Sequence, residues 1–224
     1  MDSVVLLLAM LPGFAAKIET KKVIGLNTMI ESLQSIYISR GGTDKQRSDN
    51  MKEIADHQAR VENDPRFSAI CIYAEGTQTN GTHVLNFKKG AFASMKTITP
   101  VVIKYNWKHV SPTWEGFSFL ASVIILYAYP EFGTVEVTIL PPLLPNEHLL
   151  KTHAEKGKED WEIFAWAVRD VIAKFGNFKL CNQSNADKIL YKDFMSGKTD
   201  KLEFGGKVWT AKPMYKKKSD KKTN

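Results

Sequence analysis

Cysteine is scarce in this chain. Its 224 residues contain only Cys71 and Cys181, and Cys71 stands in the apolar run 68–72, which we expect to be a buried strand. A disulfide framework is therefore excluded, and a reducing compartment is the simpler expectation. Cysteine and histidine also lack the paired spacing of metal ligands, so the sequence predicts no metal site.

Long hydrophobic runs are also missing. Residues 3–11 are nearly all apolar, but the run ends at Pro12 and is too short to cross a bilayer or to be a signal peptide without basic residues before it. We expect a buried helix with Asp2 or Ser3 as its N-cap. A second apolar run, 117–129, is also too short to span. It fits either a helix in the membrane interface or a core helix, and its lack of charge favours the core.

The body of the chain has no excess of positive charge. The net charge is +7, and residues 207–224, with seven lysines and one aspartate, carry +6 of it. This distribution argues against a nucleic-acid-binding face on the folded part. A basic tail suits the surface of an anionic membrane better.

The hydrophobic pattern predicts strands and helices in alternation. Strands at 33–39 and 68–73 flank an amphipathic helix that follows Ser48 as N-cap, which implies parallel strands joined by a right-handed crossover. The other expected elements are a short strand at 14–17, strands at 100–105 and 134–140, and a helix whose apolar face contains Trp161, Phe164, Ala165, Val168, Val171, Ile172 and Phe175.

We therefore expect an α/β protein with a mixed, largely parallel central sheet flanked by helices. The sequence predicts a single folded domain at 1–176, a C-terminal extension at 177–206 and a basic disordered tail at 207–224.

A polar loop with two glycines, 73–81, directly follows the predicted strand 68–73. Ligands of open α/β sheets bind just beyond the carboxyl ends of their strands. The loop is thus the first candidate for a substrate-binding site.

Three short motifs of this chain follow one another in the order that they have in a known protein family. Glu75-Gly76-Thr77, followed by the run 87–92, resembles the third sequence block of the glycerophospholipid acyltransferase superfamily. A strand ending in Arg40 resembles block two, and Pro100 with the strand behind it resembles block four. The likeness is strongest to the lysophosphatidylcholine and lysophosphatidylethanolamine acyltransferases and extends over residues 2–175, because the runs 112–116 and 135–142 agree as well.

The resemblance implies a catalytic dyad of a histidine base and an aspartate that orients it. Asp2 falls on the position of the aspartate, and the histidine would lie five residues earlier, upstream of Met1. Two interpretations follow: the true protein begins further upstream, or this is an acyltransferase fold without its own catalysis. Among the histidines present, only His83 follows the glycine loop closely enough to approach the site.

The resemblance also implies the substrate contacts. Arg40 would grip a phosphate, because its guanidinium matches two oxygens at once. Glu75, Gly76 and Thr77 would bind the glycerol phosphate of the acceptor. Lys88 and Lys89 are candidates to hold either that phosphate or the phosphates of coenzyme A. Pro100 would line the acyl pocket.

The function implied is transfer of a fatty acyl chain from acyl-CoA, as co-substrate, to a lysophospholipid, with no bound cofactor. The alternative is a non-catalytic structural or lipid-binding subunit of a membrane complex, so whether the chain is an enzyme stays open. Under the first interpretation the partners are lysophospholipid, acyl-CoA and a membrane surface, and under the second also other subunits.

The closing residues 221–224 resemble a di-lysine retrieval signal. We therefore expect membrane association at the cytosolic face of the endoplasmic reticulum, with a mitochondrial membrane as the alternative.

Overall fold

The computed structural model describes residues 2–22, 25–39, 43–77, 79, 81–108, 124, 128, 133–204 and 206–210. The chain divides into two compact units, Met1–Cys181 and Asn182–Asn224. Arg40, most of 117–129 and the tail from 211 onward, including the di-lysine sequence, lie outside the described residues.

Three parallel strands form the first sheet of the N-terminal unit. β1 (Gly13–Lys17) lies between β2 (Ile36–Ile38) and β3 (Ile70–Cys71). The predicted parallel direction is confirmed, but the two strands that flank the crossover helix do not pair with each other. Gly13 lets β1 enter between them, since a Cβ there would come within 3.0 Å of the Leu33 carbonyl oxygen.

The crossover helix α3 (Asp44–Asn63) begins before the predicted N-cap Ser48. Its N-cap is Thr43, whose side chain accepts from the Gln46 amide while the Gln46 side chain accepts from the Thr43 amide. This reciprocal capping box satisfies two amides at once. Because it stabilises an earlier start, Ser48 lies inside the helix.

The apolar helix at the N-terminus, α1 (Asp2–Met10), is less buried than predicted. Leu6 is buried, whereas Val4 is 58% and Leu8 86% exposed. Apolar residues surround the helix on all sides, but only one side meets the rest of the unit. Asp2 and Ser3 also belong to the first turn of the helix, and their side chains bond elsewhere instead of capping it.

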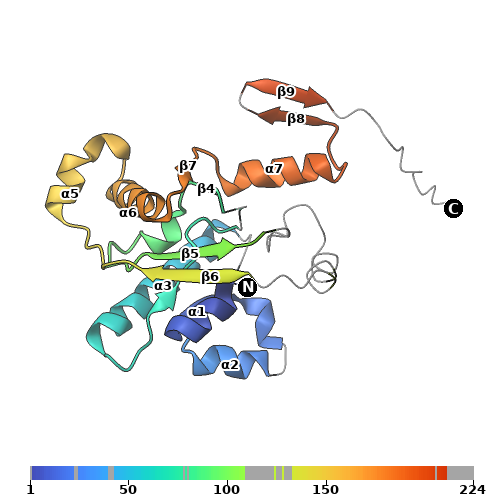
Figure 1. Ribbon diagram of the computed structural model, residues 1–224. Helices are drawn as coiled ribbons and strands as arrows, with labels where there is room; N and C mark the ends of the chain where they lie inside the picture. Colours follow the sequence, from blue (N-terminus) through green and yellow to red (C-terminus); the bar gives the residue numbers. More distant parts are fainter. Residues whose placement is uncertain are drawn as a thin grey trace. The chain divides into compact units, whose positions relative to one another are not determined.

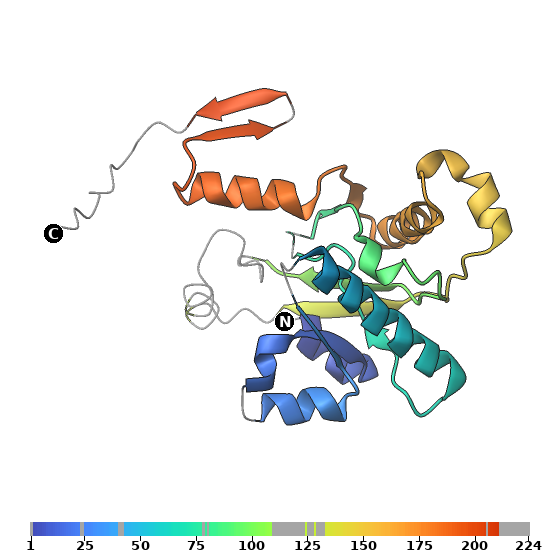
Figure 2. The same ribbon diagram turned by 180° about the vertical axis from the view of Figure 1, so that it is seen from behind.

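The second half of the unit adds an antiparallel pair, β5 (Val101–Asn106) and β6 (Thr134–Ile139), with Val101 opposite Ile139. A short parallel pair joins β4 (His83–Val84) to β7 (Lys179–Leu180). Figures 1 and 2 show α6 above the β5–β6 pair and α1 and α2 below it. The prediction of a mixed α/β fold with helices around its strands is confirmed.

The remaining helical segments of this unit are short except for α6. They are η1 (Ile18–Lys22), α2 (Leu26–Ser32), η2 (Lys89–Ala91), α5 (Glu147–Thr152), η3 (Ala154–Lys156) and α6 (Asp160–Gly176).

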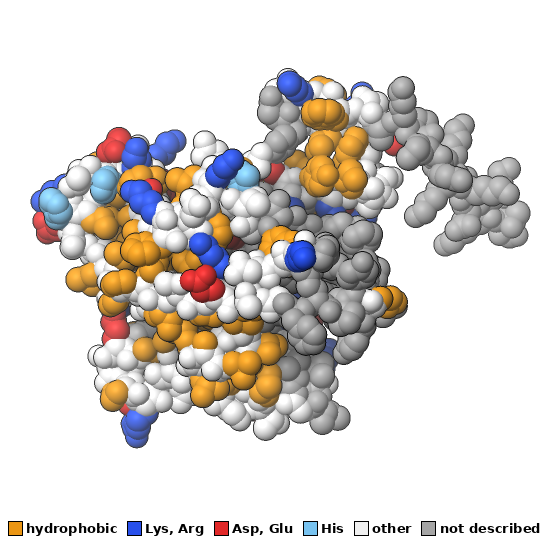
Figure 3. All heavy atoms as spheres, viewed as in Figure 1, with side chains coloured by type: hydrophobic (Ala, Val, Ile, Leu, Met, Phe, Trp, Pro, Cys, Tyr) orange, Lys and Arg blue, Asp and Glu red, His pale blue; other side chains and the backbone are white. Residues whose placement is uncertain are grey.

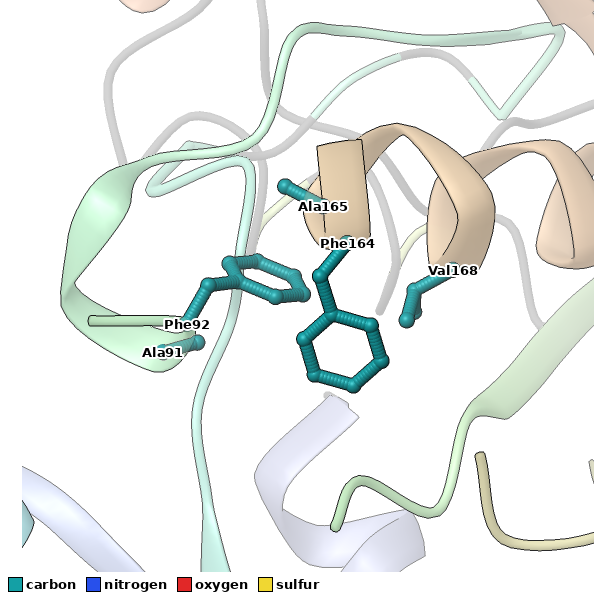
Figure 4. Close-up of a cluster of buried hydrophobic side chains, with 5 residues drawn as sticks. All are labelled: Ala91, Phe92, Phe164, Ala165 and Val168. Carbon is teal, nitrogen blue, oxygen red and sulfur yellow. The ribbon is translucent and has the colours of Figure 1, made fainter. Parts of the chain in front are cut away.

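The core joins α6 to the turn that begins with η2. Phe92 packs edge-on against Phe164 with ring centroids 5.8 Å apart, and Ala91, Ala165 and Val168 complete the cluster (Figure 4). The predicted apolar face of α6 is confirmed at its centre. Phe175, in the last turn, is 64% exposed.

The C-terminal unit contains α7 (Asn185–Met195) and the hairpin β8 (Lys201–Phe204)–β9 (Lys207–Thr210). The sequence analysis missed the helix, although Ser184 and Asp187 form a capping box that marks its start. Strand β9 also occupies residues expected in the disordered tail, because pairing with β8 satisfies its backbone. Hydrophobic side chains, Trp209 among them, are exposed on this unit (Figure 3).

Candidate active site

A cleft of about 1470 Å³ lies in the N-terminal unit, and segments far apart in the sequence line it. Asp2 from α1, Glu75 and Thr77 from the glycine loop, His83 from β4 and Pro100 before β5 all border this cleft. The tertiary structure thus brings the predicted orienting aspartate, the predicted acceptor loop and the predicted acyl-pocket proline to one space.

The Asp2 carboxylate is held by a tyrosine from β5. The Tyr105 hydroxyl donates to Asp2 Oδ1 at 2.6 Å. In the next position, Ser3 Oγ and the Tyr73 hydroxyl are 2.9 Å apart. The start of α1 is therefore fixed to β5 and to Tyr73, two residues after β3, by side chains rather than by backbone pairing.

The groups around Asp2 stay protonated at neutral pH. Burial, followed by donation to Asp2, raises the pKa of Tyr105, and burial raises that of Tyr73 to about 12. Burial and the Asp2 carboxylate raise the pKa of Cys71 to about 11. Because a thiol attacks as its thiolate, Cys71 is not a nucleophile here.

The glycine loop turns sharply after β3. Gly76 has a φ of 65°, a left-handed conformation that favours glycine. The Gly76 amide donates to the Tyr73 carbonyl at 2.9 Å, and the Lys88 amide donates to the Ala74 carbonyl at 2.9 Å. The backbone of the loop is thereby tied both to itself and to the segment that leads into η2.

The Glu75 carboxylate points toward the strand region behind the loop. Its Oε2 accepts from the Leu85 amide at 3.1 Å. Behind Leu85 lies Arg169 of α6, which is only 6% exposed and donates from Nη2 to the Val84 carbonyl at 2.9 Å. One oxygen of the Glu75 carboxylate, Oε2, therefore accepts a hydrogen bond from within the protein.

Lys88 and Lys89 have different surroundings. Lys88 is exposed, and its side chain lies over Gly76, since a Cβ built there would come 2.5 Å from Lys88 Nζ. Lys89 forms an ion pair of 2.9 Å with Glu159 and lies over the Trp161 ring. Lys88 is therefore the one of the two that the fold puts beside the glycine loop.

Among the described residues, neither His83, which lines the cleft, nor the buried His57 bonds to Asp2. His83 Nδ1 lies 2.8 Å from Thr82 Oγ1, and buried His57 bonds to the Ser68 carbonyl oxygen. Within the parts of the chain that the structure describes, no group of three or more His, Cys, Asp or Glu side chains could hold a metal ion.

Comparison with known proteins agrees with this arrangement. A family model described as acyltransferase matches residues 1–104. Lysophospholipid acyltransferase LPEAT1 of Arabidopsis thaliana is 25% identical over 84% of this chain and 45% of its own length. Lysophosphatidylcholine acyltransferase 2 of Homo sapiens is 27% identical over 77% of this chain and 30% of its own length.

A third relative, the lysophosphatidylcholine acyltransferase of Drosophila melanogaster, is 29% identical over 92% of this chain and 36% of its own length. The chain thus spans less than half the length of these relatives. The crystal structure of the 1-acyl-sn-glycerophosphate acyltransferase PlsC from Thermotoga maritima matches 75% of this chain and 56% of its own, with a TM-score of 0.43 and 19% identity.

In the N-terminal unit, helices and strands in alternation surround this cleft, as expected of an α/β protein. The family model and the named relatives show that this chain is similar to acyltransferases that act in glycerophospholipid metabolism.

Tyr105 and Arg169 were not identified from the sequence, and Tyr73, the first residue of the predicted loop, was not expected to bond to α1. Both tyrosines follow apolar strand residues, a pattern typical of core strands, and nothing in the sequence pairs them with α1. Arg169 was detectable, because it interrupts the apolar face of the helix between Val168 and Val171.

Proposed function

We propose that this protein transfers a fatty acyl chain from acyl-CoA to the free hydroxyl of a lysophospholipid. The observation that carries the proposal is that Asp2, the loop at Glu75 and Thr77, and Pro100 line the same cleft. Its relatives named as lysophospholipid and lysophosphatidylcholine acyltransferases support this choice of acceptor.

The reaction needs a base for the hydroxyl proton of the acceptor. The hydroxyl oxygen attacks the thioester carbonyl carbon, the carbon–sulfur bond breaks, and coenzyme A leaves as its thiol with the proton that the base took up. We assign Asp2 to orienting a histidine base five residues before it. Since Tyr105 occupies Oδ1 of Asp2, the second oxygen, Oδ2, would accept the imidazole N–H.

The loop would bind the polar part of the acceptor. Thr77 offers a hydroxyl at the cleft, and Lys88, whose side chain lies over Gly76, supplies a positive charge beside the loop. We assign Arg40 to the phosphate on the strength of its sequence block. For the acyl chain, Pro100 is joined by apolar lining residues that include Leu6, Met10, Ile72, Phe87 and Phe92.

We propose that this reaction takes place at a membrane surface, at the cytosolic face of the endoplasmic reticulum or alternatively at a mitochondrial membrane. Exposed Val4, Leu8 and Leu11 on and just after α1 and the lysine-rich C-terminal sequence support a surface contact. Among the described helices, none combines the length and the apolar character needed to cross a bilayer.

The test expresses the protein from its native reading frame, with whatever residues precede Met1, and measures transfer of a labelled acyl chain from acyl-CoA to lysophosphatidylcholine and lysophosphatidylethanolamine. We expect transfer, and we expect Asp2→Asn to lower kcat by about 10³- to 10⁴-fold, as loss of an orienting carboxylate does elsewhere. Asp49→Asn, on the exposed face of α3, is the matched control and should keep full activity.

Binding of lysophospholipid without any transfer would overturn the catalytic proposal. It would favour the second candidate, a non-catalytic lipid-binding subunit. Equal activity of Asp2→Asn and the wild type would remove Asp2 from the dyad.

A further inference from the structure

The peptide bond between Val84 and Leu85 lies between two opposite charges. Its carbonyl oxygen accepts from Arg169 Nη2 at 2.9 Å, and its N–H donates to Glu75 Oε2 at 3.1 Å. In a trans peptide the C=O and N–H point in opposite directions. The guanidinium and the carboxylate therefore lie on opposite sides of this peptide, and its dipole is aligned with both.

Arg169 is fastened within the core rather than at the surface. It is 6% exposed, and its Nη2 also donates to the carbonyl oxygen of Cys181. The Cys181 amide in turn donates to the Val84 carbonyl at 3.1 Å. One guanidinium thus fixes α6, the end of β4 and the residue after β7 to one another.

An apolar side chain would fill this place in the core at a lower desolvation cost. The neighbouring core positions on the same helix carry apolar side chains, those of Phe164, Ala165 and Val168. Two hydrogen bonds to charged groups through one peptide strengthen each other, because each polarises the peptide in the direction that the other needs. A buried arginine at this point therefore has a specific partner to stabilise, and Glu75 is that partner.

We propose that Arg169 is a positioning residue that holds Glu75, and with it the Gly76–Thr77 backbone, at the cleft through the Val84–Leu85 peptide. This inference rests on the proposed function only where it says that the positioned loop binds the acceptor. Burial lowers the pKa of Arg169, and Cys181 and Glu75 counteract that shift, which agrees with a guanidinium that remains charged.

The inference changes the role of Glu75. The sequence resemblance assigns its carboxylate to the acceptor, whereas the structure turns Oε2 inward to Leu85. Glu75 then acts mainly as an anchor, and Gly76 and Thr77 carry the contact with the acceptor's phosphate. Substitutions at Glu75 and Arg169 should consequently weaken acceptor binding in the same way.

The first experiment measures the Leu85 amide proton by NMR in the 1–224 chain. A carboxylate acceptor shifts an amide proton downfield, so Glu75→Gln should move the Leu85 signal upfield. Arg169→Met should move the same signal upfield and should speed hydrogen exchange of the 75–77 amides about tenfold by loosening the loop. Arg169→Lys, which keeps the charge, should recover part of both effects.

A double-mutant cycle tests the coupling. If the two charges act through one peptide, the joint effect of Glu75→Gln and Arg169→Met on the unfolding constant should depart from the product of the single effects by about tenfold. In the control cycle, Arg60→Met replaces Arg169→Met, because Arg60 is exposed on α3 and its charged partner is Glu53, at 4.0 Å. Strictly multiplicative effects, or an unmoved Leu85 signal in Glu75→Gln, would overturn the proposal.

Arg169→Met is the variant most exposed to failed folding. If Arg169→Met does not fold, the Glu75→Gln variant alone tests the proposal, by its Leu85 signal and by its kinetics with lysophosphatidylcholine. We expect its KM for the acceptor to rise about tenfold with kcat almost unchanged, as for loss of uniform binding. If the wild-type protein transferred no acyl chain, the proposed function would fall, while the NMR coupling would still decide the role of Arg169.

Discussion

Two segments that line the cleft are secured in different ways. The loop at Glu75–Thr77 is tied by backbone hydrogen bonds at Gly76 and Lys88 and by the Leu85 amide, and the buried Arg169 supports it from α6. Asp2 is held by one hydroxyl, that of Tyr105, at the start of a helix whose outer face is exposed. The glycine loop is thus positioned by the core, whereas the Asp2 carboxylate is held through the side chain of Tyr105.

The largest effect should come from the core that supports the loop. Phe164→Ala should lower the free energy of unfolding by about 3–5 kcal/mol, because a fully buried aromatic ring is removed and a cavity remains. Phe175→Ala, on the same helix but 64% exposed, should change it by less than about 0.5 kcal/mol. Urea denaturation of both variants measures the difference.

Equal losses for Phe164→Ala and Phe175→Ala would show that α6 does not pack as described. That result would also contradict the conclusion that the core positions the loop.

The second effect concerns the backbone of the loop. Gly76→Ala should destabilise the protein by about 1–2 kcal/mol, because alanine is strained at a φ of 65°. Gly81→Ala isolates this strain, since Gly81 has a φ of 75° and no heavy atom within 4 Å of its added Cβ. Any additional loss at Gly76 measures the displacement of the Lys88 side chain from the loop.

Denaturant midpoints of both glycine variants give these values. If Gly76→Ala were as stable as the wild type, the loop would not need its left-handed turn. The difference between the way the loop and Asp2 are held would then be smaller.

The smallest effect on stability should be found at the hydroxyl that holds Asp2. Tyr105→Phe removes only the hydroxyl that holds Asp2, and water can replace it at this half-buried site, so we expect a loss of about 1 kcal/mol in stability. If Asp2 orients the base, kcat should fall about tenfold with KM unchanged.

Tyr73→Phe is the matched control, since it removes a hydroxyl that bonds to Ser3 instead of Asp2. It should leave kcat within about twofold of wild type, the scale of a neutral hydrogen bond at an exposed position. A larger fall for Tyr73→Phe than for Tyr105→Phe, in steady-state assays, would contradict a special role for the hydroxyl at Asp2.

The local pattern predicted most of the regular structure. The predicted strands 33–39, 68–73 and 134–140 contain the observed strands, and 100–105 misses only the last residue of β5, because alternating or continuous apolar runs report burial directly. The start of α3 was wrong, since two capping signals lie close together and only the reciprocal bonds with Gln46 select Thr43. The exposure of α1 could not be predicted, because composition does not say how much neighbouring surface is available to cover a helix.

The candidate site was predictable only in part. Glu75, Gly76, Thr77, Asp2 and Pro100 were identified by their order along the chain, and the structure lines one cleft with most of them. Tyr105 could not be identified, because 103 positions separate it from Asp2 and no local pattern reports such a contact. The inward turn of the Glu75 carboxylate was also hidden, since it depends on a peptide in another strand.

By itself, the sequence determined the α/β class and the resemblance to glycerophospholipid acyltransferases, because hydrophobic period and ordered motifs are properties of the chain. Only the tertiary structure decided which groups hold the motifs in place. Asp2 with Tyr105, and Glu75 with Arg169 through the Val84–Leu85 peptide, are pairings across space. Hydrogen bonds act over about 3 Å, so they exist only once the core has brought distant segments together.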